Sequence, residues 1–165
     1  MWNVYVGGRY TSPAVAKVMV GGVERTVAVV ASAAADTVYA RDVENGSEFW
    51  TAHTAGTGTS PHGGPVIVGG RVYVYATNGL LFTLDLENGN EQDRFQVTGA
   101  VFASLHVTEA GGNLFMPTWD GKFIAVTSVS SAPTNLVASS QVGAVGLTWT
   151  LPAPNVSGID AVRVY

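Results

Sequence analysis

Few residues in this 165-residue chain are of the types that most often perform catalysis or bind metals. Its three histidines are His53, His62 and His106, and it has no cysteine. The histidines do not form HxH or HExxH pairs for zinc, and no GxSxG sequence marks a serine nucleophile. The absence of cysteine excludes thiolate metal ligands, disulfides and cysteine nucleophiles. We therefore predict no catalytic residue, no metal site and no bound cofactor.

Residues 54–64 are rich in glycine and threonine, a composition shared with loops that bind phosphate. The stretch lacks the Gly-Lys-Ser/Thr ending of such loops, and no helix is predicted after it. The sequence therefore favours a connecting loop at this place.

Charge and hydropathy narrow the classes of partner. The formal charge is -4 at pH 7 and only 12% of the residues are charged, so no basic stripe is available for nucleic acid. The longest apolar stretch, residues 27–35, is far shorter than the roughly 18 to 20 residues that span a bilayer. Residues 1–9 lack the pattern of a signal peptide. We expect neither nucleic-acid binding nor a membrane span.

Sugar and protein remain as candidate partners. Asn45-Gly46-Ser47 and Asn155-Val156-Ser157 match the N-glycosylation pattern, although turn geometry explains the first equally well. Aromatic side chains are candidates for a binding face, but strand alternation places most of them in the core. Trp119, just before Asp120-Gly121, is the aromatic residue that we single out as a candidate exposed contact.

The most informative carboxylates belong to a tandem repeat. The segment at residues 40–50 returns in weaker form at residues 83–91, an offset of 43 residues. Valine, threonine, tyrosine and glycine dominate, which favours strands joined by tight turns, and no helix is predicted. A period of about 40 to 50 residues with this content is typical of one blade of a β-propeller.

The second unit shows the expected order of one blade most clearly. Strands are predicted at 65–68, 71–76, 80–86 and 91–97, separated by glycine-containing turns. Asn78-Gly79 and Asn88-Gly89 suit type I′ turns, which need positive φ at both central residues. The sequence therefore predicts four antiparallel strands joined by hairpins.

The first and third units follow the same order with changes. The first carries about nine extra residues, which we expect to lengthen the strands around Gly21-Gly22-Val23-Glu24. In the third unit, Thr127 stands where a third aspartate is expected and the next turn is lost. The predicted blades cover about residues 10–54, 60–98 and 99–128 within a propeller part at 1–128, followed by a linker at 129–133.

Residues of the first unit resemble the tryptophan-docking motif of the PQQ-like, or quinoprotein-type, propeller repeat: Ala40, Asp42, Gly46 and Trp50. Asp can bind turn amides, Gly permits a left-handed turn and the flat Trp can pack on the neighbouring blade. In the second unit Asp85 and Gly89 persist, Asp93 replaces the tryptophan, and Phe95 can supply an aromatic side chain on the same face. The motif residues therefore have structural roles.

The resemblance implies two alternative functions. Enzymes of this family hold pyrroloquinoline quinone with calcium at the propeller centre, so one alternative is a fragment of a PQQ-dependent oxidoreductase. The preferred alternative is a non-enzymatic binding or assembly protein, because fold analogy does not transfer function. Low lysine and abundant Gly, Thr, Val and Ser indicate an extracellular setting, on a bacterial cell surface or a virion.

Residues 134–165 resemble the first strands of a fibronectin type III domain. Leu147 and Trp149 on one strand, with Val162 and Val164 on the next, are predicted to share the core of this sandwich. A complete sandwich needs about 100 residues, so this module is expected to be incomplete.

The predicted fold is all-β: a partial β-propeller of about three four-stranded antiparallel blades plus an incomplete fibronectin type III-like β-sandwich. Three blades leave exposed strand edges, so we expect both parts to be completed either by further sequence of the same polypeptide or by a protein partner or a second copy of the chain. Residues 2–6 are expected to form the outer strand of an adjacent blade, with Trp2 in the docking position; the alternative is a disordered start.

Overall fold

A computed structural model describes most of the chain, with gaps. The described residues are 1–6, 11–54, 61, 63–97, 105–107, 113–118, 121–127, 134–141, 144–150 and 161–164. All regular structure within these ranges is β, which confirms the predicted fold class.

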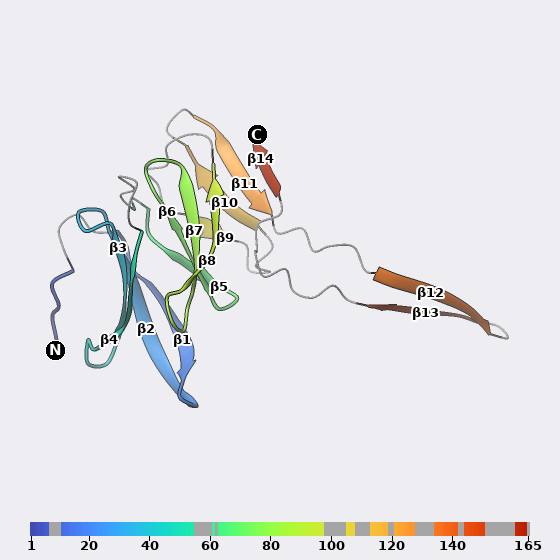
Figure 1. The fold of residues 1–165 in the computed structure, drawn as a ribbon, viewed down its shortest axis with the longest axis horizontal. Coiled ribbons are helices and arrows are strands. Elements are labelled where there is room, and N and C mark those ends of the chain that lie inside the picture. The colour runs from blue at the N-terminus through green and yellow to red at the C-terminus, as the bar shows by residue number, and fades with distance from the viewer. Residues whose placement is uncertain are drawn as a thin grey trace.

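Three four-stranded antiparallel sheets follow one another along the chain, as Figure 1 shows. Each of the first two is a simple meander of four consecutive strands, as expected for a propeller blade. The first sheet contains β1 (Ala14–Val20), β2 (Val23–Ser32), β3 (Thr37–Asp42) and β4 (Glu48–His53). The second contains β5 (Val66–Val68), β6 (Arg71–Tyr75), β7 (Leu80–Asp85) and β8 (Glu91–Gln96).

The turns of the second blade differ from the predicted type I′ geometry. Gly79 and Gly89 have φ of 88° and 73°, but neither Asn78 nor Asn88 has positive φ. The amide of Gly79 donates to the carbonyl of Ala76 at 3.0 Å, which closes a tight turn that ends in a left-handed glycine. The asparagines instead accept hydrogen bonds on their side chains from the amides two residues later.

The first blade carries the predicted expansion as a long β1–β2 hairpin. β1 and β2 have 7 and 10 residues, whereas β5 and β6 at the same places in the second blade have 3 and 5. Pairing continues without a break to Val20 and Val23, next to the Gly21-Gly22 turn. The hairpin therefore extends past the turns of the second blade (Figure 1).

The third blade draws its fourth strand from an unexpected place. β9 (His106–Val107), β10 (Asn113–Pro117) and β11 (Phe123–Thr127) pair in order, and β14 (Ala161–Val164) pairs with β11. Sequence reasoning placed residues 161–164 beside the preceding strand of a sandwich, but the pairing differs. The physical reason is that β11 offers a row of free backbone groups that any extended segment can pair.

β12 (Thr134–Gln141) and β13 (Ala144–Thr150) form a separate two-stranded hairpin, which extends away from the blades in Figure 1. The side chains of the predicted sandwich core, Leu147, Trp149, Val162 and Val164, lie outside the described part of the structure. Their shared core stays a prediction.

Two apolar clusters lie between successive blades. The first joins β-branched residues of β2, β3 and β6 with Trp50, Leu84 and Leu86. The second joins Tyr75, Leu81 and Val97 to residues of the third blade such as Met116 and Ile124. Burial raises the pKa of the Tyr75 hydroxyl to about 12 because the phenolate would lose its hydration. Contact between blades, rather than within a single sheet, therefore supplies the described core.

Candidate protein-interaction site

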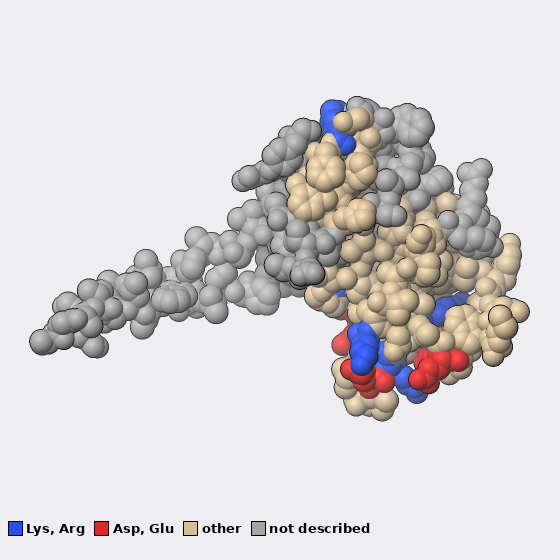
Figure 2. Space-filling model, turned by 180° about the vertical axis from the view of Figure 1, so that it is seen from behind, with Lys and Arg blue, Asp and Glu red and all other residues tan. Residues whose placement is uncertain are grey.

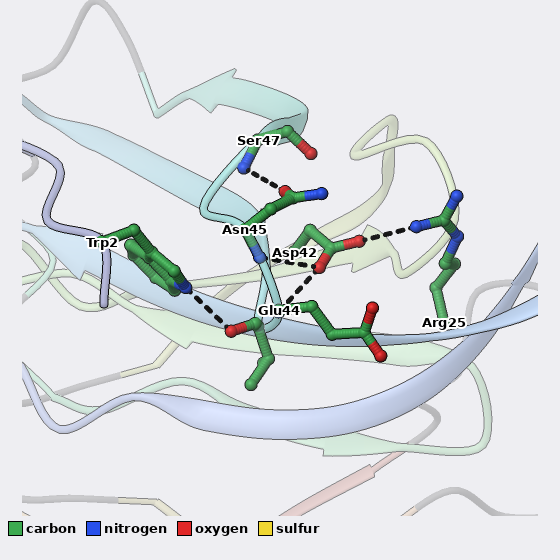
Figure 3. Close-up of polar contacts among 7 residues, drawn as sticks. Trp2, Arg25, Asp42, Glu44, Asn45 and Ser47 are labelled. Atoms are coloured by element: carbon green, nitrogen blue, oxygen red, sulfur yellow. Dashed lines mark hydrogen bonds and ion pairs between the residues drawn. The ribbon is translucent and has the colours of Figure 1, made fainter.

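The turn between β3 and β4 is organised by one buried carboxylate. Asp42 is 2% exposed, and its Oδ1 accepts hydrogen bonds from the amides of Glu44 at 2.7 Å and Asn45 at 3.3 Å. Its Oδ2 lies 3.2 Å from a guanidinium nitrogen of Arg25 (Figure 3). Because these donors satisfy both oxygens, the carboxylate of Asp42 fixes the turn.

Gly46 completes this turn and receives an indole from outside the blade. Its φ is 75°, and a Cβ built on it would lie 2.6 Å from the nearest ring atom of Trp2. The indole nitrogen of Trp2 donates to the carbonyl of Val43 at 2.9 Å (Figure 3). Residues 1–6 form no strand, yet Trp2 occupies the docking position. The turn therefore holds the indole through two contacts: Gly46 packs against the ring, and the carbonyl of Val43 accepts its hydrogen bond.

The turn between β7 and β8 repeats this geometry in the second blade. The Oδ1 of Asp85 accepts from the amides of Glu87 at 2.8 Å and Asn88 at 3.1 Å. Gly89, with φ of 73°, would bring a Cβ within 2.6 Å of the ring of Trp50.

Trp50 links the outer strand of the first blade to this second turn. Its indole nitrogen donates to the carbonyl of Leu86 at 2.8 Å. It is 6% exposed and belongs to the first apolar cluster, whereas Trp2 is 39% exposed. Ala40, fully buried, pairs directly with Trp50 in the β3–β4 ladder. The same docking geometry therefore occurs twice: the indole of Trp50 is buried, and the indole of Trp2 is partly exposed.

The second blade has no tryptophan at the position equivalent to Trp50. Asp93 stands in that position, and its carboxylate accepts from the amide of Arg94. Arg94 forms an ion pair with Glu91 and lies 4.9 Å above the centre of the Phe82 ring. Phe95 packs against the second apolar cluster, which includes residues of the third blade. The aromatic side chain at this junction therefore packs in the apolar core and does not rest on a docking turn.

A groove of about 440 Å³ separates the long hairpin from the second blade. Its lining combines apolar side chains with charges of both signs and two turn glycines, and it includes Lys17, Met19, Gly69, Gly70, Arg71 and Glu87. In the view of Figure 2, charged side chains gather at one end of the described surface, around this hairpin. At the opposite end, the described part of the surface in this view shows one basic group. The groove therefore lies at the charged end.

Sequence reasoning did not identify the apolar tip of the β1–β2 hairpin as a surface. Met19, Val20 and Val23 are 52%, 38% and 56% exposed. The signal in the sequence was the insertion itself, because a hairpin longer than its repeat counterpart must project from the blade. The ion pair between Lys17 and Glu24, at 2.6 Å and well exposed, lies just behind this tip.

Other predicted features lie elsewhere or outside the described residues. Trp119 and the third docking turn lie outside them, as does His62. His53 is exposed and hydrogen-bonds to Thr37 through Nδ1 at 3.1 Å. Across the described ranges, no group of acidic or histidine side chains is arranged to hold a metal ion. No helix long enough to cross a membrane occurs in those ranges either.

Comparison with known proteins decides the family. The model of a PQQ-repeat family, described as outer membrane protein assembly factor BamB, matches residues 2–145. The chain belongs to this family. The BamB-family match confirms the propeller part of the resemblance seen in the sequence and gives no support to a fibronectin type III module.

A solved structure has the same fold as this BamB-family chain. The crystal structure of BamB from Moraxella catarrhalis matches with a TM-score of 0.52 at 18% sequence identity. The match covers 74% of this chain and 40% of that BamB. The chain therefore spans less than half of that protein. No curated protein sequence matches.

Proposed function

We propose that this chain is a non-enzymatic protein-interaction module that takes part in assembly within the cell envelope. Membership of a family described as an outer membrane protein assembly factor supports this class of function. The observation that carries the proposal is the β1–β2 hairpin, which projects beyond the second blade and exposes Met19, Val20 and Val23 at its tip.

Exposed apolar side chains on a projecting hairpin are typical of a surface that binds another protein. Val18, next to the tip, is 6% exposed and belongs to the apolar cluster between the first two blades. The base of the hairpin is therefore held by the core while the tip remains free to contact a partner. The adjacent groove adds charged groups of both signs to this part of the surface, and polar and charged groups surround the apolar centre of many protein interfaces.

The recurring carboxylates support a structural role and not quinone chemistry. Asp42 and Asp85 both bind amides of their own turns. An enzyme that uses pyrroloquinoline quinone with calcium needs free acidic ligands for the metal. Titration of the chain with pyrroloquinoline quinone and calcium should give no saturable change in absorbance, and stoichiometric binding would contradict the proposal.

The partner and the place are parts of the same proposal. A protein partner or a second copy would pack against the exposed blade edges and complete the propeller, since edge strands of a sheet readily pair. We infer the cell envelope as the location from the family description. Surface display, a virion and a glycan partner, which composition and aromatic content suggested, find no support in the comparisons.

Crosslinking from the hairpin tests the proposal. A photo-reactive amino acid is placed at Met19 or at Val23, and as a control at Asn78 on the opposite end of the second blade. Protein crosslinks in the envelope fraction are expected from the hairpin positions and not from Asn78. Equal crosslinking from all three positions would contradict the proposal. A Val20→Ser substitution, at an exposed site between the two probes, should reduce the hairpin crosslinks while the melting temperature changes little.

A further inference from the structure

We propose that the free edge of β1, beside the groove next to the second blade, binds an extended strand of a partner protein that carries an acidic residue opposite Lys17. The proposal rests on the protein-interaction function above and names the chemistry of the partner. It adds to the exposed tip of the hairpin a second kind of contact, which the backbone makes.

The turn of the β1–β2 hairpin sets which backbone groups face β2. Gly21 and Gly22 have φ of 58° and 81°, as in a two-residue type I′ turn. In such a hairpin the residues that flank the turn, Val20 and Val23, exchange both backbone hydrogen bonds. Every second pair after them lacks these bonds, and the backbone groups of its β1 residue point to the free edge.

Met19 and Lys17 are the β1 residues of the two pairs of this kind that lie nearest the turn. Their partners on β2 are Glu24 and Thr26. The carbonyl of Thr26 accepts from the amide of Val43 at 3.0 Å, on the side away from β1, which agrees with this alternation. Within the described part of the chain, no other strand pairs with this edge of β1. Lys17 and Met19 therefore offer their amides and carbonyls to an added strand.

β1 lacks the features that shield the other edges of the first two blades. The outer strands β4 and β8 shift register against their neighbours, and each leaves one residue, Phe49 or Gln92, without a partner in the ladder. β5, the inner strand of the second blade, has only 3 residues. β1 has 7 residues in unbroken register with β2, and Lys17 is its one charged residue. Bulges, charges and short length hinder the addition of a strand, so β1 is the edge of these four that is best suited to accept one.

The groove of about 440 Å³ lies beside this edge. Lys17 and Met19 line it on the side of the hairpin, and the Gly69-Gly70 turn and Glu87 line it on the side of the second blade. The groove therefore leaves room for side chains of an added strand. Met19 is 52% exposed, so an apolar residue of the partner can cover it.

Lys17 selects the partner. It lies between Val15 and Met19, whose side chains share its face of the strand. The symmetric pairing of two copies that uses all three residues would place one Lys17 directly opposite the other, and like charges in this position destabilise a sheet. An acidic residue opposite Lys17 is favoured instead, with apolar residues two positions away on each side. The ion pair of Lys17 with Glu24 does not prevent this, because both side chains are well exposed.

Binding of labelled peptides to the full chain tests the proposal. The probe is fluorescein-labelled Thr-Val-Thr-Glu-Thr-Val-Thr, and its control has lysine in place of the glutamate. Saturable binding of the acidic peptide is expected, with at least about fivefold weaker binding of the lysine peptide. In the Lys17→Glu chain this preference should reverse. Absence of saturable binding, or a preference that Lys17→Glu leaves unchanged, would overturn the proposal.

Methylation of single peptide amides tests for strand addition without altering the protein. The amide of the central glutamate would donate to the carbonyl of Lys17, so the peptide methylated there should bind about tenfold more weakly. The amide of the next threonine would point away from β1, and the peptide methylated at that place should bind like the parent peptide. Equal weakening by the two methyl groups would overturn the proposal.

Met19→Pro makes the same test on the protein. Proline removes the amide of Met19, which the ladder with β2 does not use, so the melting temperature should change little while peptide binding weakens at least about fivefold. Unchanged binding would place the peptide elsewhere and overturn the proposal. A dimer of the unaltered chain that Met19→Pro abolishes would identify a second copy as the occupant and overturn the assignment to a different protein.

The outcome is separable from that of the crosslinking experiment. Hairpin crosslinks that persist while the acidic peptide fails to bind would refute the added strand and leave the interaction function standing. Peptide binding without crosslinks in the envelope fraction would refute the envelope partner and leave the strand-binding edge standing.

Discussion

Trp50 lies against Gly89 so closely that a single methyl group on the glycine would stand 2.6 Å from two atoms of the indole ring. The contact joins residues from different blades, and Leu86 adds a hydrogen bond to the same ring at 2.8 Å. Side-chain size at one turn therefore controls how two sheets pack.

Gly89→Ala should destabilise the chain far more than a matched substitution at Gly21. Both glycines have positive φ, at 73° and 58°, so both variants carry a backbone cost of about 1 kcal/mol. Only the methyl at position 89 meets the buried indole, which should add about 2 kcal/mol of overpacking. Urea unfolding of the two variants measures the difference. Equal losses would show that Trp50 moves aside without cost.

Removing the two docked tryptophans should have unequal effects. Trp50→Ala leaves a cavity in the first apolar cluster and should cost about 3 to 5 kcal/mol of unfolding free energy. Trp2→Ala should cost about 1 kcal/mol or less, because the side chain is 39% exposed. Thermal and urea melts of both variants test this order. A larger loss from Trp2→Ala would mean that residues 1–6 hold the first blade together.

Asp42→Ala should be more harmful than Asp85→Ala, although both carboxylates cap equivalent turns. Asp42 is 2% exposed, and its loss leaves the amides of Glu44 and Asn45 without their acceptor, at a cost of about 1 to 3 kcal/mol. Asp85 is less buried, so water can replace its oxygens.

Arg25→Ala separates the ion pair from the turn itself. The Arg25 side chain is 45% exposed, so loss of its contact with Asp42 should cost less than about 1 kcal/mol. If Arg25→Ala proved as damaging as Asp42→Ala, the ion pair rather than the amide bonds would hold the turn.

Alkaline pH should destabilise the chain through Tyr75. Its pKa is raised to about 12 in the folded state, whereas an unfolded tyrosine titrates near 10. Below pH 10 the hydroxyl is neutral in both states; above it the unfolded state loses its proton first. Stability should therefore fall as pH rises from 10 to 12, by about 2 kcal/mol in all. Urea unfolding at several pH values, with Tyr75→Phe as the control that lacks this slope, measures the effect.

Much of the fold was predictable because the repeat carries its own geometry. The spacing of Asp42 and Asp85 matches two equivalent turns, and the β3–β4 and β7–β8 ladders shift register at corresponding points, after Ala40 and after Thr83. The extra residues around Gly21 form the expected long hairpin. Local patterns suffice for these features since each depends on neighbouring residues alone.

The features that sequence reasoning missed depend on contacts between distant segments. Nothing local to residues 161–164 indicates that they pair with β11, because an alternating strand fits many edges equally well. The sequence predicted that Phe95 supplies an aromatic side chain here, but its packing against residues of the third blade could not be seen without the position of that blade. The type I′ prediction for the asparagine–glycine turns was wrong for a different reason. Asn78 and Asn88 accept hydrogen bonds on their side chains and so keep negative φ.

The two docking turns also give the propeller a direction. Each indole comes from a segment earlier in the chain and is received by a turn that follows it, so each of these two contacts has a donor side and an acceptor side. The acceptor turn of blade one, at Gly46, is filled by the indole of Trp2. A segment that packs on such a turn in the same way therefore has to present an indole, and a segment that offers only another acceptor turn will not fit there.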